Sequence, residues 1–289
     1  MIPAKFEYHR PRSIDEAVAL LGRFGDDGRV LAGGHSLIPM MKLRLAEPSH
    51  LVDINGISEL KGIAEKSGVL TIGAATTQAD LLASDVIREK CPILIETAEV
   101  VADPQVRYCG TLGGNVANGD PGNDYPAVMI ALSATFTLRG PDGVRQVAAD
   151  GFYRGIFDTA LGEGELLAEI NIPVPAAGHG YAYEKMKRKV GDYATAAAAV
   201  VLTMSGGTCE SATIALTNLG STPLKVSAGA AALVGKAIDE AAIEEAARDA
   251  VEVADPASDL RGPAAYRKQM AGEMTRRALK RALQRAQGA

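Results

Sequence analysis

Two glycine-rich stretches, which we expect to form loops, carry the residue types best suited to holding a phosphorylated ligand. They are Ala32-Gly33-Gly34-His35-Ser36 and Thr111-Leu112-Gly113-Gly114-Asn115. Glycine lets a ligand approach the main chain closely, and consecutive exposed N–H groups form concavities that suit phosphate oxygens. Ser36, Thr111 and Asn115 add side chains that can donate or accept hydrogen bonds. Two such stretches predict a ligand with two phosphates, which points to a dinucleotide.

Neither stretch matches the better-known phosphate-binding patterns. The chain has no G-x-x-x-x-G-K-[ST] motif, and it has no G-x-G-x-x-G between a strand and a helix with an acidic residue downstream. A P-loop ATPase and a Rossmann cofactor site are therefore not indicated. The alternative is that a double glycine only marks a tight turn, as we expect for Gly206-Gly207.

The residues that could bind a metal or act in catalysis are dispersed along the chain. The three cysteines do not form a disulfide framework, and no C-x-x-C or H-E-x-x-H motif is present. We therefore predict no metal or iron–sulfur site built by this chain alone. His35 is flanked by glycine and serine rather than by a carboxylate, so we expect a loop role and predict no catalytic residue. The residues considered are Cys91, Cys109, Cys209, His9, His35, His50 and His179.

Composition excludes several classes of function. The net charge is −5 and aromatic residues make up 4% of the 289 residues, without tryptophan. These values disfavour nucleic-acid binding and base stacking. The N-terminus lacks the apolar stretch of a signal peptide, and the longest apolar run, 194–204, is too short to span a bilayer. We expect a cytoplasmic protein.

Local signals divide the chain into three parts. Residues 1–58 are predicted to form an α/β subdomain, in which Ser13 and Glu16 form a capping box and residues 29–32 form a strand that enters the first glycine stretch. Residues 59–176 are predicted to form a second α+β subdomain. After Pro173-Val174-Pro175, residues 177–289 are predicted to form a C-terminal domain with a three-stranded antiparallel sheet and helices. The fold class is therefore α+β.

Several strings resemble a known family. Besides the two glycine stretches, they are residues 102–108, 118–124 and 179–185 and Gly191-Asp192-Tyr193-Ala194. The chain resembles the FAD-binding medium subunits of molybdenum hydroxylases, the family that includes xanthine dehydrogenase. The glycine stretches define the broad family, and the longer flanking strings favour its carbon monoxide dehydrogenase branch.

The resemblance implies a set of cofactor contacts. Residues 32–36 and 111–115 would hold the diphosphate of a noncovalent FAD, largely through main-chain N–H groups. Asp124 would lie near the adenosine or ribityl part, and Tyr193 against the isoalloxazine. Lys185 belongs to a basic cluster with Lys187, Arg188 and Lys189 that could stabilise a reduced, anionic flavin. The alternatives are a loop-stabilising aspartate, an ordinary strand tyrosine and a solvated charge run.

The resemblance also implies partners. A small subunit would carry [2Fe-2S] clusters and a large subunit the molybdenum cofactor, in a dimer of heterotrimers. Electrons would pass through this chain to a quinone, and the complex could associate with the inner face of the membrane. The alternatives are a medium subunit of a related hydroxylase acting on an aldehyde, purine or N-heterocycle, a stand-alone flavin enzyme, and a nonenzymatic nucleotide-binding module.

Overall fold

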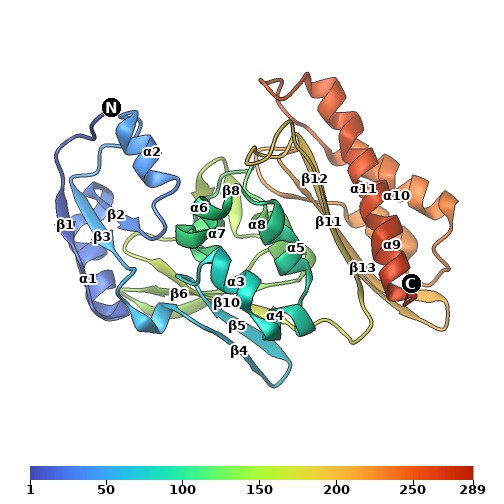
Figure 1. Cartoon of the computed structure of the whole chain (residues 1–289), viewed down its shortest axis with the longest axis horizontal. Helices are drawn as coiled ribbons and strands as arrows, with labels where there is room; N and C mark the ends of the chain where they lie inside the picture. Colours follow the sequence, from blue (N-terminus) through green and yellow to red (C-terminus); the bar gives the residue numbers. More distant parts are fainter. Residues whose placement is uncertain (289) are drawn as a thin grey trace.

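Residues 1–288, which the computed structural model describes, form three units that follow one another from left to right (Figure 1). Ala289, the last residue of the predicted 177–289 domain, lies outside the described residues. Each unit contains a β-sheet with helices packed on it. The α+β class is therefore confirmed. The divisions after residues 58 and 176 stay predictions.

The N-terminal unit is a parallel sheet of three strands in the order β1-β3-β2. Its first helix begins where predicted, because the Ser13 hydroxyl accepts the N–H of Glu16 at 3.1 Å. The second half of the predicted capping box differs, because Glu16 accepts the N–H of Arg12 instead of that of Ser13. The elements are β1 (Glu7–His9), α1 (Ile14–Phe24), η1 (Gly25–Asp27), β2 (Gly28–Leu31), α2 (Leu37–Lys42), β3 (His50–Asp53) and η2 (Ser58–Leu60).

The middle unit is an antiparallel sheet of five strands in the order β4-β5-β10-β6-β7, with short helices packed beside it (Figure 1). A full capping box between Thr77 and Asp80 starts the first of these helices, as the sequence indicates. The strands are β4 (Ile63–Lys66), β5 (Val69–Gly73), β6 (Thr135–Gly140), β7 (Gly143–Ala148) and β10 (Leu166–Pro173), with a hairpin of β8 (Tyr153–Gly155) and β9 (Asp158–Thr159). The helices are α3 (Gln78–Ala83), α4 (Asp85–Lys90), α5 (Ile93–Val100), α6 (Pro104–Cys109), α7 (Leu112–Ala117) and α8 (Tyr125–Ala131).

The C-terminal unit has four strands in the order β11-β12-β13-β14, so the predicted three-stranded sheet was wrong. The missed strand, β14, has two residues that pair with Ala215 and Leu216. A strand this short leaves no alternating pattern in the sequence. The elements are β11 (Gly180–Met186), β12 (Ala196–Ser205), β13 (Thr208–Thr217), β14 (Leu224–Lys225), α9 (Ser227–Leu233), α10 (Glu240–Val253) and α11 (Ala264–Ala286). None of the helices within residues 1–288 combines the length and the apolar character needed to cross a membrane.

The alanine-rich strand β12 joins the middle and C-terminal units. Ala197 and Ala199 pack into the core of the middle unit, whereas Ala196 and Ala198 pack into the core beneath the C-terminal helices. Successive side chains of a strand point to opposite faces, so both faces of β12 are buried. A strand that is buried on both faces requires apolar side chains at successive positions, and this explains the continuous hydrophobicity of the segment.

Enlarging a side chain of β12 is expected to destabilise the fold. Ala198→Leu adds three carbons at a fully buried position and should lower the free energy of unfolding by about 1–3 kcal/mol. Ser205→Leu, at the exposed end of the same strand, is the control and should change it by less than about 0.5 kcal/mol. Urea denaturation measures both values. Equal urea midpoints for Ala198→Leu and Ser205→Leu would show that the surroundings of Ala198 are not tightly packed.

Candidate cofactor site

A cavity of about 880 Å³ lies where the three units meet. Its wall includes every residue predicted to contact the cofactor except Leu112. The volume falls within the range of about 300–1,000 Å³ that is typical of small-molecule sites. The structure therefore brings together two glycine stretches that are about 80 residues apart in sequence, as well as residues of the C-terminal unit.

The first glycine stretch is a loop between β2 and α2 with unused hydrogen-bond donors. Within residues 1–288, no protein group accepts a hydrogen bond from the main-chain N–H of any residue from Gly33 to Ser36. Asn55 holds the start of the loop, because its side-chain amide donates to the carbonyl of Ala32 at 2.8 Å. His35 Nδ1 lies 2.7 Å from the carbonyl oxygen of Gly33, and the residue is exposed. These donors are what an anionic ligand such as a diphosphate requires.

The second glycine stretch is not a loop, so that expectation was wrong. Residues 112–117 form α7, and the Thr111 hydroxyl caps it by accepting the N–H of Gly114 at 3.0 Å. The N–H groups of Leu112 and Gly113 donate to the carbonyls of Thr76 and Ala74, both at 2.9 Å. These amides are therefore already paired within the protein. The Leu112 side chain is fully buried in the core of the middle unit.

Both stretches use glycine to bring main chains together. A Cβ on Gly33 would lie 2.4 Å from the carbonyl oxygen of Cys109, and a Cβ on Gly113 would lie 2.6 Å from that of Ala74. Distances this short are not tolerated between real side chains and main chain. The wall of the cavity is thus built from backbone where the N-terminal and middle units meet.

Asp124 and Lys185 form a buried ion pair beside the cavity. Lys185 Nζ lies 2.8 Å from Asp124 Oδ2, and the two side chains are 2% and 6% exposed. Tyr183 donates its hydroxyl proton to Asp124 Oδ1 at 2.5 Å. Burial raises the pKa of Asp124, and the neighbouring Lys185 and Tyr183 oppose this rise. The Lys185 charge is therefore matched by a carboxylate, rather than being free to act on a ligand.

Local sequence signals did not reveal two partners of this pair and one contact of the second glycine stretch. Tyr183 is one of them, and burial raises its pKa well above the ordinary value. The carbonyl of Val100 is the second, since it accepts hydrogen bonds from both Lys185 and Lys187 at 3.2 Å. Asn123 makes the contact with the second glycine stretch, because its side chain donates to the carbonyl of Asn115 at 2.7 Å. Tyr183 and Lys185 both fall in the string 179–185, but no local signal identifies the side chains that they meet.

The remaining members of the predicted basic cluster differ in how close they lie to the ion pair. Burial and the nearby Lys185 lower the pKa of Lys187. Arg188 is exposed and pairs with Asp192 at 2.9 Å, and Lys189 is exposed. The cluster therefore separates into a part that is shielded from solvent and a part that faces it. Arg188 and Lys189 face solvent, as the alternative of a solvated charge run requires.

Tyr193 presents an aromatic face at the cavity edge. Its ring packs on Gly122, where an added Cβ would lie 2.8 Å from Tyr193 Cδ1. The guanidinium carbon of Arg261 lies 5.4 Å from the ring centroid. Partial burial and the nearby Asp120 raise the pKa of Tyr193 to about 12. The phenol therefore stays protonated at neutral pH, which suits stacking and hydrogen bonding rather than proton abstraction.

A buried polar atom also indicates a ligand in this cavity. Gln78 is 2% exposed, and within residues 1–288 its Oε1 has no hydrogen-bond partner although the residue lines the cavity. An unpaired buried acceptor costs free energy unless a ligand or a water donates to it. The cavity thus offers free main-chain donors, an unpaired acceptor and an aromatic face. This combination of groups fits a flavin dinucleotide.

Comparisons with known proteins agree with this geometry. The family model "FAD binding domain in molybdopterin dehydrogenase" matches residues 4–175, and "CO dehydrogenase flavoprotein C-terminal domain" matches residues 181–282. The carbon monoxide dehydrogenase medium chain of Afipia carboxidovorans is 58% identical over 99% of each chain. That of Hydrogenophaga pseudoflava is 53% identical over 96% of this chain and 97% of its own.

A solved structure of Cu,Mo-CO dehydrogenase in a cyanide-inactivated form superposes with a TM-score of 0.97 at 58% identity, covering 99% of this chain and 100% of the other. The protein described here belongs to the family of FAD-binding medium subunits of molybdenum hydroxylases. The resemblance read from the glycine stretches is thus confirmed. The class of protein is an FAD-containing oxidoreductase subunit.

Removing one member of the buried ion pair is expected to be costly. Asp124→Asn leaves the Lys185 charge buried without its carboxylate and should lower the free energy of unfolding by about 3–5 kcal/mol. Adding Lys185→Met should restore much of that loss, because no unpaired charge then remains. Urea denaturation without added flavin measures both.

The control for this prediction is an exposed ion pair. Lys225 and Asp150 lie 2.7 Å apart with side chains 41% and 58% exposed. Asp150→Asn should change the free energy of unfolding by less than about 1 kcal/mol. If Asp124→Asn has an effect as small as that of Asp150→Asn, the pair is not buried in solution.

Proposed function

We propose that this chain is the FAD-binding medium subunit of an aerobic, molybdenum-containing carbon monoxide dehydrogenase. It would accept electrons from the iron–sulfur clusters of a small partner subunit and pass them to a quinone. A large molybdenum subunit would supply those electrons to the clusters. The single observation that carries the proposal is the match over 99% of the chain to a carbon monoxide dehydrogenase medium chain at 58% identity. The proposed assembly is a dimer of heterotrimers in the cytoplasm, at the inner face of the membrane where quinone is available.

The chain's own residues would bind and orient the flavin. The free N–H groups of residues 33–36 donate to the diphosphate oxygens, and Gln78 Oε1 accepts from a ligand donor. Thr111 and Asn115 supply polar groups at the start of α7. The bound FAD supplies a two-electron store that joins one-electron donors to a two-electron acceptor.

The C-terminal unit would set the surroundings of the ring. Tyr193, which lines the cavity, would pack against the isoalloxazine and limit the access of water. Asp124, held by Lys185 and Tyr183, keeps acceptor capacity on its oxygens for a ribityl or ribose hydroxyl. Because Lys185 is paired with Asp124, little of its charge remains to stabilise a reduced ring.

Flavin attachment and substrate can be tested on the assembled complex. Acid precipitation should release one FAD per copy of this chain, because the proposed contacts are noncovalent. Carbon monoxide should bleach the flavin absorbance of the complex, whereas the isolated, flavin-loaded chain should not respond. A complex bleached by an aldehyde, a purine or an N-heterocycle but not by carbon monoxide would favour the related hydroxylase. Turnover by the isolated chain would contradict the role of an electron-transfer subunit.

The phosphate-binding role of the first glycine stretch can be tested with two matched glycines. Gly34 has φ +73° and Gly178 has φ +75°, and a Cβ on Gly178 would meet nothing within 4 Å. Alanine at such φ costs about 1–2 kcal/mol, so the backbone strain is similar at both positions, and a Cβ on Gly34 additionally displaces the flexible end of Ile38, whose Cδ1 would lie 2.6 Å away. Gly34→Ala should weaken FAD binding by about tenfold or more, and Gly178→Ala should leave it unchanged. Flavin fluorescence titration measures the affinity, and equal effects would contradict the loop model.

A further inference from the structure

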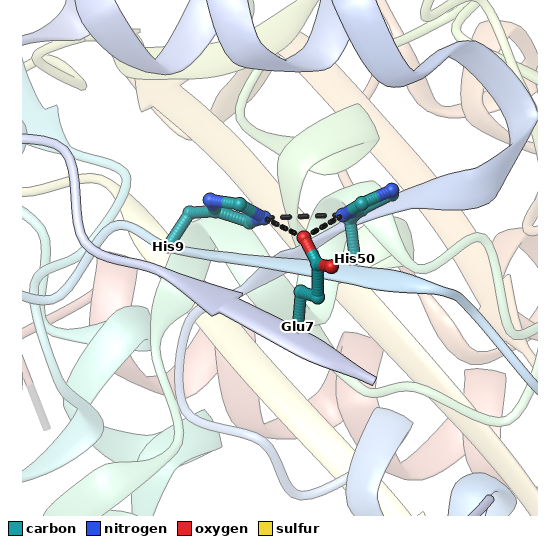
Figure 2. Close-up of side chains that lie close together, drawn as sticks. All are labelled: Glu7, His9 and His50. Atoms are coloured by element: carbon teal, nitrogen blue, oxygen red, sulfur yellow. Dashed lines mark hydrogen bonds and ion pairs between the residues drawn. The ribbon is translucent and has the colours of Figure 1, made fainter. Parts of the chain in front are cut away.

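Two histidines and a glutamate converge on one face of the N-terminal sheet. His9 Nε2 lies 3.1 Å from His50 Nδ1. Glu7 Oε2 lies 3.5 Å from His50 Nδ1 and 3.9 Å from His9 Nε2. Figure 2 shows the carboxylate oxygen directed at both ring nitrogens. The cluster combines the side-chain types that bind zinc in proteins.

The pairing of β1 with β3 creates this arrangement. The two strands are parallel, and Glu7 is in register with His50. Glu7 and His9 are two residues apart, so both point to the same face of the sheet as His50. Tyr8 points to the opposite face, where its hydroxyl donates to Asp53. Histidines that are 41 residues apart in sequence therefore meet through strand register.

The end of α1 holds the imidazole rings in place. The Phe24 ring stacks on His50 with a centroid separation of 3.8 Å and an interplanar angle of 7°. Its centroid lies 4.7 Å from that of His9. The histidine side chains are 24% and 23% exposed, whereas Glu7 is 70% exposed. The two nitrogen ligands are thus oriented by packing, and the carboxylate closes the site from the solvent side.

The distances between donor atoms match a metal site. Four ligands at about 2.0–2.1 Å from a tetrahedral zinc ion lie about 3.3 Å from one another. The three separations here run from 3.1 to 3.9 Å. Without an ion, two imidazole nitrogens this close need a proton between them, since two lone pairs repel. A divalent cation satisfies both nitrogens and neutralises the carboxylate.

We propose that Glu7, His9 and His50 form a binding site for Zn²⁺ or a similar borderline divalent cation, with a fourth position open to water. This departs from the sequence-based prediction of no metal site, which rested on the spacing of histidines along the chain. The ion clamps β1 to β3, and His50 is also in register with Gly28 of β2, the strand that leads into the first glycine stretch. The site is structural, and it does not depend on the proposed function.

Metal titration of the full-length chain, purified without a histidine tag and treated with a chelator, tests the proposal. Calorimetry should show one Zn²⁺ bound per chain in the presence of excess Mg²⁺, and the ion should raise the thermal unfolding temperature. Co²⁺ should give the intense visible absorption of a four-coordinate site. Absence of stoichiometric Zn²⁺ binding would overturn the proposal.

Variants locate the ion. Glu7→Gln should weaken Zn²⁺ binding by about tenfold or more, and because Glu7 is largely exposed this variant is expected to fold. His9→Gln should abolish stoichiometric binding. The controls are Glu47→Gln, at an exposed position of the same unit, and His179→Gln, in the loop before β11; both should bind as the original chain does.

Two outcomes would place the ion elsewhere and overturn the proposal. One is Zn²⁺ affinity unchanged by both Glu7→Gln and His9→Gln. The other is binding that is lost in Cys109→Ser, because Cys109 is an exposed free thiol. FAD content, measured in the same samples, should be equal in all variants. A loss of flavin therefore reports on the cofactor site, and a loss of Zn²⁺ reports on the histidine cluster.

Discussion

The close approach of main chain to main chain at Gly33 and Gly113 is the constraint on which the rest of the structure depends. Gly33 lies against the end of α6, and Gly113 lies against the end of β5. These contacts dock the N-terminal unit against α6, and α7 against the middle sheet, with no side chain between them. The first glycine loop therefore faces the start of α7 across a cavity, and its free N–H groups point away from the protein's own acceptors.

The C-terminal unit completes the cavity because it cannot separate freely from the middle unit. Alternate alanines of β12 belong to two cores. Glu96 of α5 also pairs with Arg281 and with Arg285, both on α11. Small side chains allow the sheet to lie close to its neighbours on both faces, and the ion pairs fix its direction. Tyr193 and Lys185 therefore take positions relative to the glycine loop that packing, rather than local structure, determines.

Pairing of polar groups governs both the cofactor site and the histidine cluster. Asp124 and Lys185 are buried, and burial without a partner would be costly for either charge. Their ion pair makes the aspartate a fixed acceptor at the cavity and removes most of the field that the lysine would exert alone. The same reasoning applies to His9 and His50, whose facing nitrogens require a proton or a metal ion between them.

The sequence by itself determined the class of fold, the family and most elements, because these follow from local patterns. Ser13 and Thr77 start helices through contacts three residues away, and the nearly continuous apolar run in residues 196–204 fits a strand buried on both faces. It also identified part of the cavity wall, since the family motifs contain those residues, but not Gln78. It misjudged residues 111–115 as a loop, because two adjacent glycines usually disfavour a helix, and packing against Ala74 outweighs that preference.

Only the tertiary structure decided which side chains meet. Lys185 and Asp124 are 61 residues apart, and His9 and His50 are 41 apart. Such partners depend on strand register and on the docking of whole units, which no window of neighbouring residues encodes. The two-residue strand β14 was missed for the same reason, since its pairing with β13 is all that defines it. Local sequence sets the elements, and long-range packing sets the chemistry between them.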